Sequence, residues 1–394
     1  MPFAQTTLEM SRFEFVSLAS RPGANVRQLC DHFQISPTTA YKWIKRHRED
    51  PVGGLKDRSR RPRSSPWHCS SEVEDAVMVL HREYPFWGAR KLRQLIPAHL
   101  AAPAASTIQR IIERHGCKIR SNHQQRGPFT RFERPAPNCL WQMDYKGDIA
   151  LSRGGRCYPL LVEDDHSRYS ITLSALGTVR REPTQEVLRL CFQRYGLPEA
   201  ILCDNGPPWG NSDPGSIYTG LGVWLLQLGV ELIHSRPYHP QTQGKCERLN
   251  RTIELEVLGR TLPWEDLGQC QEHFEHWRHR YNHIRPHEAL GMKSPASCYE
   301  HSRRLMPQQP LREDYLEGDT VRRVKSKGEI TFKNKFYYVG KAFVGLPIGI
   351  RPTITEGVYD VYYSWKCLGS IDLKKARKAK YRYHPIIKEE GPLE

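Results

Sequence analysis

Three carboxylates in this chain occupy positions that suit phosphodiester chemistry. Asp144 and Asp204 each close a short apolar run typical of a strand, and Glu247 lies on the first turns of an expected helix. Phosphodiester cleavage needs an activated water or hydroxyl and neutralisation of charge, and two Mg²⁺ ions roughly 3.5–4 Å apart supply both. Because Mg²⁺ prefers oxygen ligands, three carboxylates meeting on one side of a sheet predict a two-Mg²⁺ site, with Mn²⁺ expected to substitute.

Other interpretations of these acids stay open. Asp204, followed by Asn and Gly, is also a common turn sequence. Asp164 and Asp165 compete for a ligand role, but they are predicted to hydrogen-bond the end of a strand. Glu254, seven residues after Glu247 on the same helical face, is a weaker candidate for the third ligand.

The composition favours a polyanionic partner. Lys and Arg number 59 among 394 residues, Asp and Glu number 43, and the formal net charge is +16. A charge of this size suits nucleic acid, although a generally basic protein without such a partner would show it too. Beside Glu247, the side chains of Lys245, Arg248 and Arg251 are expected to hold phosphates, or else are plain solvated charges.

Several classes of protein are disfavoured. No apolar run approaches the ~20 residues that a membrane-spanning helix needs, and the N-terminus lacks the basic and then apolar pattern of a secretion leader. The 11 cysteines are scattered without a Cys-x-x-Cys pair, which predicts free thiols in a reducing cytoplasm rather than disulfides or a zinc knuckle. The stretch with His273, His276 and His279 is expected to serve packing rather than metal binding.

The N-terminal region predicts a helix-turn-helix. Apolar residues fall on one face from Val26 to Phe33, a short turn follows, and Ser36-Pro37 is a typical helix start. The next helix is basic on its exposed face, which favours a helix that enters the major groove, although a three-helix packing module would look similar. The side chains predicted to contact DNA are Thr38, Thr39, Lys42, Lys45 and Arg46.

A basic linker and a second helical region follow. The arginines of the linker at 51–69 are predicted to contact DNA, unless the segment is only a charged spacer. They are Arg58, Arg60, Arg61 and Arg63. Residues 70–125 are predicted to form either a tandem helix-turn-helix or a packing or dimerisation unit, in which Ser106 caps the last helix.

The remaining sequence predicts two further domains. Between 138 and 300, three strands are followed by helix, strand, helix, strand and helix, which is the order of an α/β ribonuclease-H-like domain. Beyond 310, five short strands separated by Gly, Asn and charged turns predict a small, basic, all-β barrel of the SH3-like kind. The chain is therefore expected to be multidomain, with all-α helix-turn-helix units at 1–50 and 70–125, the core at 138–300 and the barrel at 310–384.

A set of motifs, taken in order, resembles the bacterial insertion-sequence transposases of the single-frame type, whose catalytic core is like that of retroviral integrases. The motifs are Trp141-Gln-Met-Asp144, Asp164-Asp-His-Ser-Arg168-Tyr, Asp204-Asn205-Gly206, the stretch from His239 to Thr252, and the stretch from Tyr281 to Leu290. Singly they are weak, but their order is specific. The resemblance covers the core and, less closely, the N-terminal helices.

The resemblance implies that Asp144, Asp204 and Glu247 are the catalytic triad of a DDE transposase. It implies cleavage of 3′ ends at terminal inverted repeats and attack of the freed 3′-OH on target DNA, by a homo-oligomer assembled on double-stranded DNA. It places the protein in the bacterial cytoplasm, with the nucleoid. The alternatives are a regulatory DNA-binding derivative of a transposase and a ribonuclease-H-type nuclease that acts on RNA hybrids.

One departure from the retroviral integrases lies between Asp204 and Glu247, where the 42 intervening residues form a longer interval. The excess falls at 207–215, directly after the second acid. We hypothesise that Trp209 in this loop stacks on DNA near the cleaved end. The alternative is a plain surface insertion.

Overall fold

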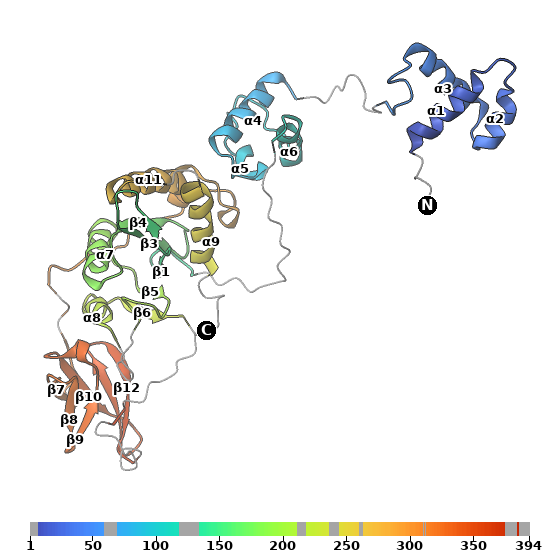
Figure 1. Cartoon of the computed structure of the whole chain (residues 1–394). Helices are drawn as coiled ribbons and strands as arrows, with labels where there is room; N and C mark the ends of the chain where they lie inside the picture. Colours follow the sequence, from blue (N-terminus) through green and yellow to red (C-terminus); the bar gives the residue numbers. More distant parts are fainter. Residues whose placement is uncertain are drawn as a thin grey trace. The chain divides into compact units, whose positions relative to one another are not determined.

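The computed structural model describes residues 7–58, 69–117, 134–210, 218–235, 244–259, 263–309, 311, 313–374 and 384–385. The chain divides into two units, Met1–Cys69 and Ser70–Glu394 (Figure 1). None of the described helices is long and apolar enough to cross a membrane.

The described residues of the first unit form three helices. They are α1 (Leu8–Ala19), α2 (Val26–Phe33) and α3 (Pro37–Glu49). Gln34 adopts a left-handed conformation with a φ of 53°, which ends α2 and turns the chain. The Ser36 hydroxyl accepts a hydrogen bond from the Thr39 amide and Pro37 occupies the first helical turn, so α3 starts where the sequence predicts. Trp43 packs into the core, and the predicted helix, turn and helix are confirmed.

Three short helices begin the second unit. They are α4 (Ser71–Glu83), α5 (Ala89–Arg93) and α6 (Ala105–Arg114). The predicted cap at Ser106 is wrong, because α6 starts two residues earlier than predicted and its N-cap, Ala104, makes no side-chain hydrogen bond. Packing sets the position of α6 instead, since Ile108 and the isoleucines one turn further on are fully buried.

A mixed sheet forms the centre of the second unit. Its strands are β1 (Leu140–Tyr145), β2 (Ile149–Ala150), β3 (Arg156–Asp164), β4 (Ser170–Leu176), β5 (Ala200–Cys203) and β6 (Glu231–His234). Their order is β2-β3-β1-β5-β6, and β4 pairs with β3. Strand β3 runs antiparallel to β1 and β4, whereas β1, β5 and β6 are parallel. The predicted succession of strands and helices from β1 to the helix that carries Glu247 is confirmed, with the short β2 as an additional strand.

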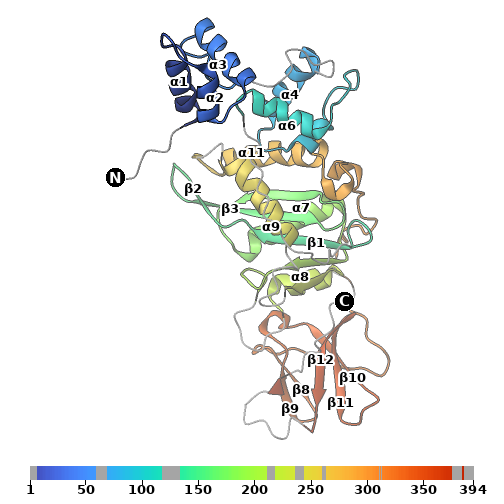
Figure 2. The same ribbon diagram turned by 90° about the vertical axis from the view of Figure 1, so that its right-hand side faces the viewer.

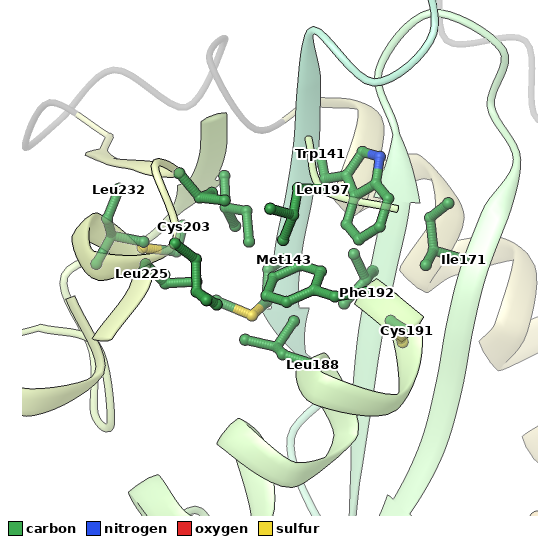
Figure 3. Close-up of a cluster of buried hydrophobic side chains, with 14 of the residues drawn as sticks. Trp141, Met143, Ile171, Leu188, Cys191, Phe192, Leu197, Cys203, Leu225 and Leu232 are labelled. Atoms are coloured by element: carbon green, nitrogen blue, oxygen red, sulfur yellow. The ribbon is translucent and has the colours of Figure 1, made fainter. Parts of the chain in front are cut away.

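Helices cover both faces of this sheet. They are α7 (Arg181–Tyr195), α8 (Gly220–Gln227), α9 (Gly244–Ile253) and α11 (Leu267–His279), with the short turns η2 (Glu254–Leu258), η3 (Arg280–Ile284), η4 (Glu288–Leu290) and η5 (Pro295–Ser297). On one face, Trp141 and Met143 of β1 share a buried cluster with Leu188 and Phe192 of α7 (Figure 3). On the other face, Leu249 of α9 packs in a second cluster with side chains of α11. The sheet is therefore packed on both faces, through β1 and β5 on the α7 side and through β3 and β4 on the α9 side.

The C-terminal region consists mainly of strands. They are β7 (Thr320–Arg323), β8 (Glu329–Phe332), β9 (Lys335–Tyr338), β10 (Pro347–Pro352), β11 (Val358–Tyr363), β12 (Lys366–Asp372) and β13 (His384–Pro385), with the helical turn η6 (Lys341–Phe343). One sheet has the order β12-β11-β10-β7 and the other the order β13-β9-β8. The five predicted strands are confirmed. Strands β12 and β13 are further ones, and β12 follows a left-handed residue, Ser364, with a φ of 50°.

Helix α8 lies between the central sheet and the C-terminal strands. Its Leu221 and Leu225 belong to the core of the sheet, whereas Val223 and Leu226 belong to the core of the C-terminal region. Trp365 Nε1 also donates a hydrogen bond to the Leu226 carbonyl at 3.2 Å. Burial on two sides explains why this helix is apolar all round.

Candidate active site

Two of the three predicted acids lie side by side. In the parallel pairing of β1 and β5, Gln142 lies opposite Leu202. Asp144 and Asp204 each follow two residues later, so the same register places them beside each other. Side chains alternate along a strand, so both acids leave the sheet on the face opposite to the buried Met143. That is the face covered by α9, which lies across the sheet (Figure 2).

Helix α9 contacts Asp144 through an amide. Asn250 Nδ2 donates a hydrogen bond to Asp144 Oδ2 at 2.6 Å. Burial raises the pKa of Asp144, the hydrogen bond from Asn250 lowers it, and repulsion by Asp204 raises it again. Negative charge at this position is therefore incompletely compensated by the protein itself.

Glu247, the third predicted acid, lies three residues before Asn250 on the same helix and is exposed. Residues three apart lie on one side of a helix, so Glu247 is carried by the turn of α9 that contacts Asp144. Within the described parts of the chain, no three Asp, Glu, His or Cys side chains converge closely enough to hold a metal ion. The structure therefore brings two of the acids together and places the third on the neighbouring helix.

The loop after β5 leaves one oxygen of Asp204 open. Asp204 Oδ1 accepts hydrogen bonds from the Gly206 amide and from Trp209 Nε1. A Cβ atom at position 206 would lie 3.0 Å from Oδ2, so the glycine keeps space beside that oxygen. His234 Nδ1 donates to the backbone carbonyl of Asp204 at 2.9 Å. Two adjacent carboxylates with an accessible oxygen and uncompensated charge form a donor set that suits a hard divalent cation.

Trp209 does not have the role that we hypothesised. Its side chain is buried, with 1% exposed, and its ring is stacked on Tyr145 at a centroid distance of 5.3 Å. A ring enclosed in the core of the sheet has no free face for a DNA base. The DNA-stacking hypothesis is therefore wrong for this residue, and residues 211–217 of the same loop lie outside the described residues.

Lys245 also differs from its prediction. Its Nζ lies 2.6 Å from Asp165 Oδ1 and 3.1 Å from the Asp165 carbonyl, and the Asp165 side chain is fully buried. An ammonium group already paired in this way is poorly placed to hold a phosphate.

Asp164 accepts hydrogen bonds from the Ser167 amide and from the Asn138 amide, so the predicted strand-end role of the paired aspartates is confirmed.

The other predicted DNA contacts are exposed to different degrees. Both Arg248 and Arg251 on α9 are exposed. In the first unit, the exposed side chains are Thr38, Lys42, Lys45 and Arg58. The half-buried ones are Thr39 and Arg46. The remaining linker positions, Arg60, Arg61 and Arg63, lie outside the described residues.

A buried cluster around Glu256 connects the second helical region to the core. The Glu256 carboxylate accepts hydrogen bonds from Nε1 of Trp87 at 3.1 Å and from Nε1 of Trp277 at 3.0 Å, and it pairs with Arg285. Burial and the positive charge of Arg285 lower the pKa of Lys91, on α5, to about 7. No local sequence signal marks this cluster, because Trp87 and Glu256 are 169 residues apart.

The histidine-rich stretch lies on α11. His273, His276 and His279 line an open pocket of about 650 Å³ together with Glu256 and Arg280. The His273 ring is stacked on Trp264 at a centroid distance of 5.4 Å. Of the three, His273 is half-buried and packs in this way, whereas His276 and His279 are exposed.

Family models match separate parts of the chain. A helix-turn-helix domain matches residues 12–63, a homeodomain-like domain 39–112, the integrase core domain 134–240 and 228–295, and the C-terminal domain of IS481 family transposases 319–379. These matches support the helix-turn-helix, the integrase-like core and the transposase character of the chain.

The curated relatives include bacterial and viral proteins. An uncharacterised protein of insertion element IS476 from Xanthomonas euvesicatoria is 24% identical over 69% of this chain and 74% of its own length. A protein of insertion element IS407 from Burkholderia multivorans is 24% identical over 59% of this chain and 82% of its own. The Gag-Pol polyprotein of feline leukemia virus is 29% identical over 34% of this chain and 8% of its own.

Two solved structures are also similar to parts of this chain, at low identity. A chain of the simian T-cell lymphotropic virus intasome has 15% identity and a TM-score of 0.36, over 74% of this chain and 97% of its own. The HTLV-2 integrase catalytic core domain in complex with magnesium has 16% identity and a TM-score of 0.31, over 42% and 99%. The family models and the insertion-element relatives confirm the predicted similarity to bacterial insertion-sequence transposases with an integrase-like core.

Proposed function

We propose that this chain, which resembles insertion-sequence transposases in its core and its C-terminal region, is a metal-dependent DNA transposase. It binds the terminal inverted repeats of its element, cleaves the 3′ ends and joins them to target DNA by transesterification. The substrate is double-stranded DNA, and the active form is a homo-oligomer assembled on it in the bacterial cytoplasm, with the nucleoid. The catalytic and metal-binding residues are Asp144, Asp204 and Glu247.

The adjacent pair of acids at the ends of β1 and β5 carries this proposal. Asp144 and Asp204 occupy neighbouring positions on one face of the sheet, and Glu247 lies on the helix whose Asn250 holds Asp144. Movement of the exposed Glu247 side chain toward the pair would complete a three-carboxylate site. Oxygen ligands of this kind favour Mg²⁺, with Mn²⁺ as a substitute.

The chemistry that two Mg²⁺ ions supply at such a site is activation of a water or 3′-hydroxyl and neutralisation of the leaving oxygen. The protein's own groups orient the acids and bind the substrate. Asn250 fixes the plane of the Asp144 carboxylate, and Gly206 keeps an oxygen of Asp204 accessible. The exposed Arg248 and Arg251, next to Glu247 on α9, hold the phosphates on either side of the scissile bond.

The flanking regions recognise DNA. In this proposal α3 enters the major groove with Thr38, Lys42 and Lys45, and the linker arginines follow the backbone. The second helical region, 70–125, reads a further part of the end. The C-terminal strands form an SH3-like barrel within 310–384 that adds basic contacts. The catalytic domain spans 138–300.

The test uses labelled duplexes that carry the two DNA ends flanking the gene. In Mg²⁺ the full-length protein is expected to nick each end at its 3′ terminus and to join it to a plasmid. The Asp204→Asn protein is expected to do neither, whereas Asp75→Asn, at an exposed position on α4, retains both activities. Binding of the ends without cleavage would favour the regulatory derivative. Cleavage of an RNA–DNA hybrid in place of the duplex would favour the nuclease.

A further inference from the structure

The segment after the second acid is folded back on itself. The Gly210 amide donates a hydrogen bond to the Gly206 carbonyl at 2.6 Å. A Cβ atom at position 210 would lie 1.8 Å from the Asn205 carbonyl oxygen, which is closer than any side chain can approach. Only glycine permits this return of the chain. The return directs Trp209 inward, away from the surface on which the sequence places it.

The Trp209 ring is fixed by its surroundings. It is stacked on Tyr145 with an interplanar angle of 14°, and the Tyr145 hydroxyl shares a hydrogen bond of 2.8 Å with the Thr184 hydroxyl. Thr184 in turn donates to the Arg180 carbonyl at 2.7 Å. The ring therefore belongs to the cluster that packs between the sheet and α7.

A buried indole needs a partner for its N–H, and here the partner is a carboxylate. Trp209 Nε1 donates to Asp204 Oδ1, which also accepts the Gly206 amide. Both donors meet the same oxygen, so the carboxylate has one orientation and Oδ2 is turned toward the space that Gly206 leaves. The indole thus links the core on one face of the sheet to the acid on the other.

The chemical nature of this donor matters. Asp165, whose role is structural, is neutralised by Lys245, whereas no Lys or Arg of the described residues pairs with Asp204. A cationic partner would orient the carboxylate but would also compete with a metal ion for its charge. An indole N–H orients it and leaves the full negative charge available.

We propose that Trp209 is a positioning residue, which sets the orientation of Asp204 and reserves Oδ2 for a divalent cation. This inference rests on the proposed function, because it requires that Asp204 bind the metal. It assigns to the loop of 207–210 a role in building the metal site rather than in contacting DNA.

The test compares Mn²⁺ binding by full-length proteins, measured as loss of the electron paramagnetic resonance signal of the free ion. Trp209→Phe keeps a ring for Tyr145 but removes the donor. We expect its Mn²⁺ affinity to fall by about 10-fold or more, as is usual when a partner that orients a metal ligand is lost. Cleavage by this variant should recover as Mn²⁺ is raised. Trp224→Phe is the matched control, because Trp224 is stacked on Phe192 in the same core. This substitution is expected to leave the Mn²⁺ affinity unchanged.

A second variant protects the test from a failure of Trp209→Phe to fold. L-3-Benzothienylalanine at position 209, introduced by nonsense suppression, has the shape of tryptophan with sulfur in place of the N–H. The same loss of Mn²⁺ affinity is expected. Wild-type affinity in either folded variant would overturn the role of Trp209 and leave the proposed function standing. A wild-type protein that neither binds Mn²⁺ nor cleaves DNA ends would overturn both.

Discussion

The carboxylates of this chain are held in two different ways, and the first is by cations. Asp165 is fully buried and pairs with Lys245, and Glu256 is 11% exposed and pairs with Arg285. Each of these acids also accepts hydrogen bonds from side chains that are distant in the sequence. Their charge is neutralised inside the protein, so these acids stabilise the packing of one element against another.

The second way is by neutral donors. Asp144 accepts a hydrogen bond from the amide of Asn250, and Asp204 accepts them from the indole of Trp209 and a backbone amide. The two acids also lie close enough for Asp204 to raise the pKa of Asp144. Such an arrangement keeps negative charge at a cost to stability. Under the proposed function, this contrast separates the acids that would bind a cation from the acids that hold the fold.

Asp144→Asn tests the contrast with the largest expected effect. Cleavage of DNA ends should fall by on the order of 10⁴-fold, as for other groups that act as a catalytic unit. The free energy of unfolding should stay the same or rise, because burial and the charge of Asp204 disfavour the ionised acid. End-cleavage assays and urea denaturation measure the two quantities. Strong destabilisation would place Asp144 among the structural acids instead.

Glu256→Gln should have the opposite profile. It leaves Arg285, whose side chain is 9% exposed, without its counter-charge, so the free energy of unfolding should fall by about 3–5 kcal/mol. Urea denaturation measures the change. Glu186→Gln, which removes an exposed partner of Arg189 on α7, serves as the control and should have no measurable effect. Equal stability of the two variants would mean that the Glu256 cluster does not fasten the second helical region.

The acids and the strands that carry them are predictable because they depend on local pattern. The apolar runs before Asp144 and Asp204 predict strands, and the intervening helices predict parallel neighbours. The start of α3 follows from Ser36 and Pro37 alone. In each case the residues that decide the structure lie within a few positions of one another.

The supporting contacts are not predictable in this way. The sequence around Trp209, with two prolines and a glycine, is typical of an exposed loop, and only the close return at Gly210 and the ring of Tyr145 turn it inward. Lys245 has the spacing of a phosphate ligand, but a buried Asp165, 80 residues away, pairs with it. Asn250 is the exception, since its spacing of three from Glu247 is a signal that a search for amides beside the acids would have found.

Glu163 extends the comparison to a buried acid without an ion pair in the described structure. Burial raises its pKa from the ordinary value of 4.5 to about 8, and it accepts a hydrogen bond from the Tyr281 hydroxyl at 3.1 Å. Because the pKa of Glu163 is higher in the folded state, the contribution of this group to the free energy of unfolding is complete below pH 4.5. It is lost as pH rises toward 8. At ~1.4 kcal/mol per unit, the loss amounts to a few kcal/mol. Urea denaturation across this range measures it, and Glu163→Gln should flatten the profile. An unchanged slope in the variant would contradict the assignment.

The smallest expected effect separates Lys245 from Arg251, two of the three cations beside Glu247 on α9. Arg251 is exposed and is expected to neutralise a phosphate, so Arg251→Gln should reduce the slope of log affinity against log salt by about 0.9. Lys245 already neutralises Asp165, so Lys245→Gln should leave the slope unchanged while lowering the free energy of unfolding. Titrations of labelled duplex ends at several salt concentrations measure the slopes. If both variants reduced the slope of log affinity against log salt equally, Lys245 would have to leave Asp165 when DNA binds. The division between structural and substrate-binding charges would then fail at this helix.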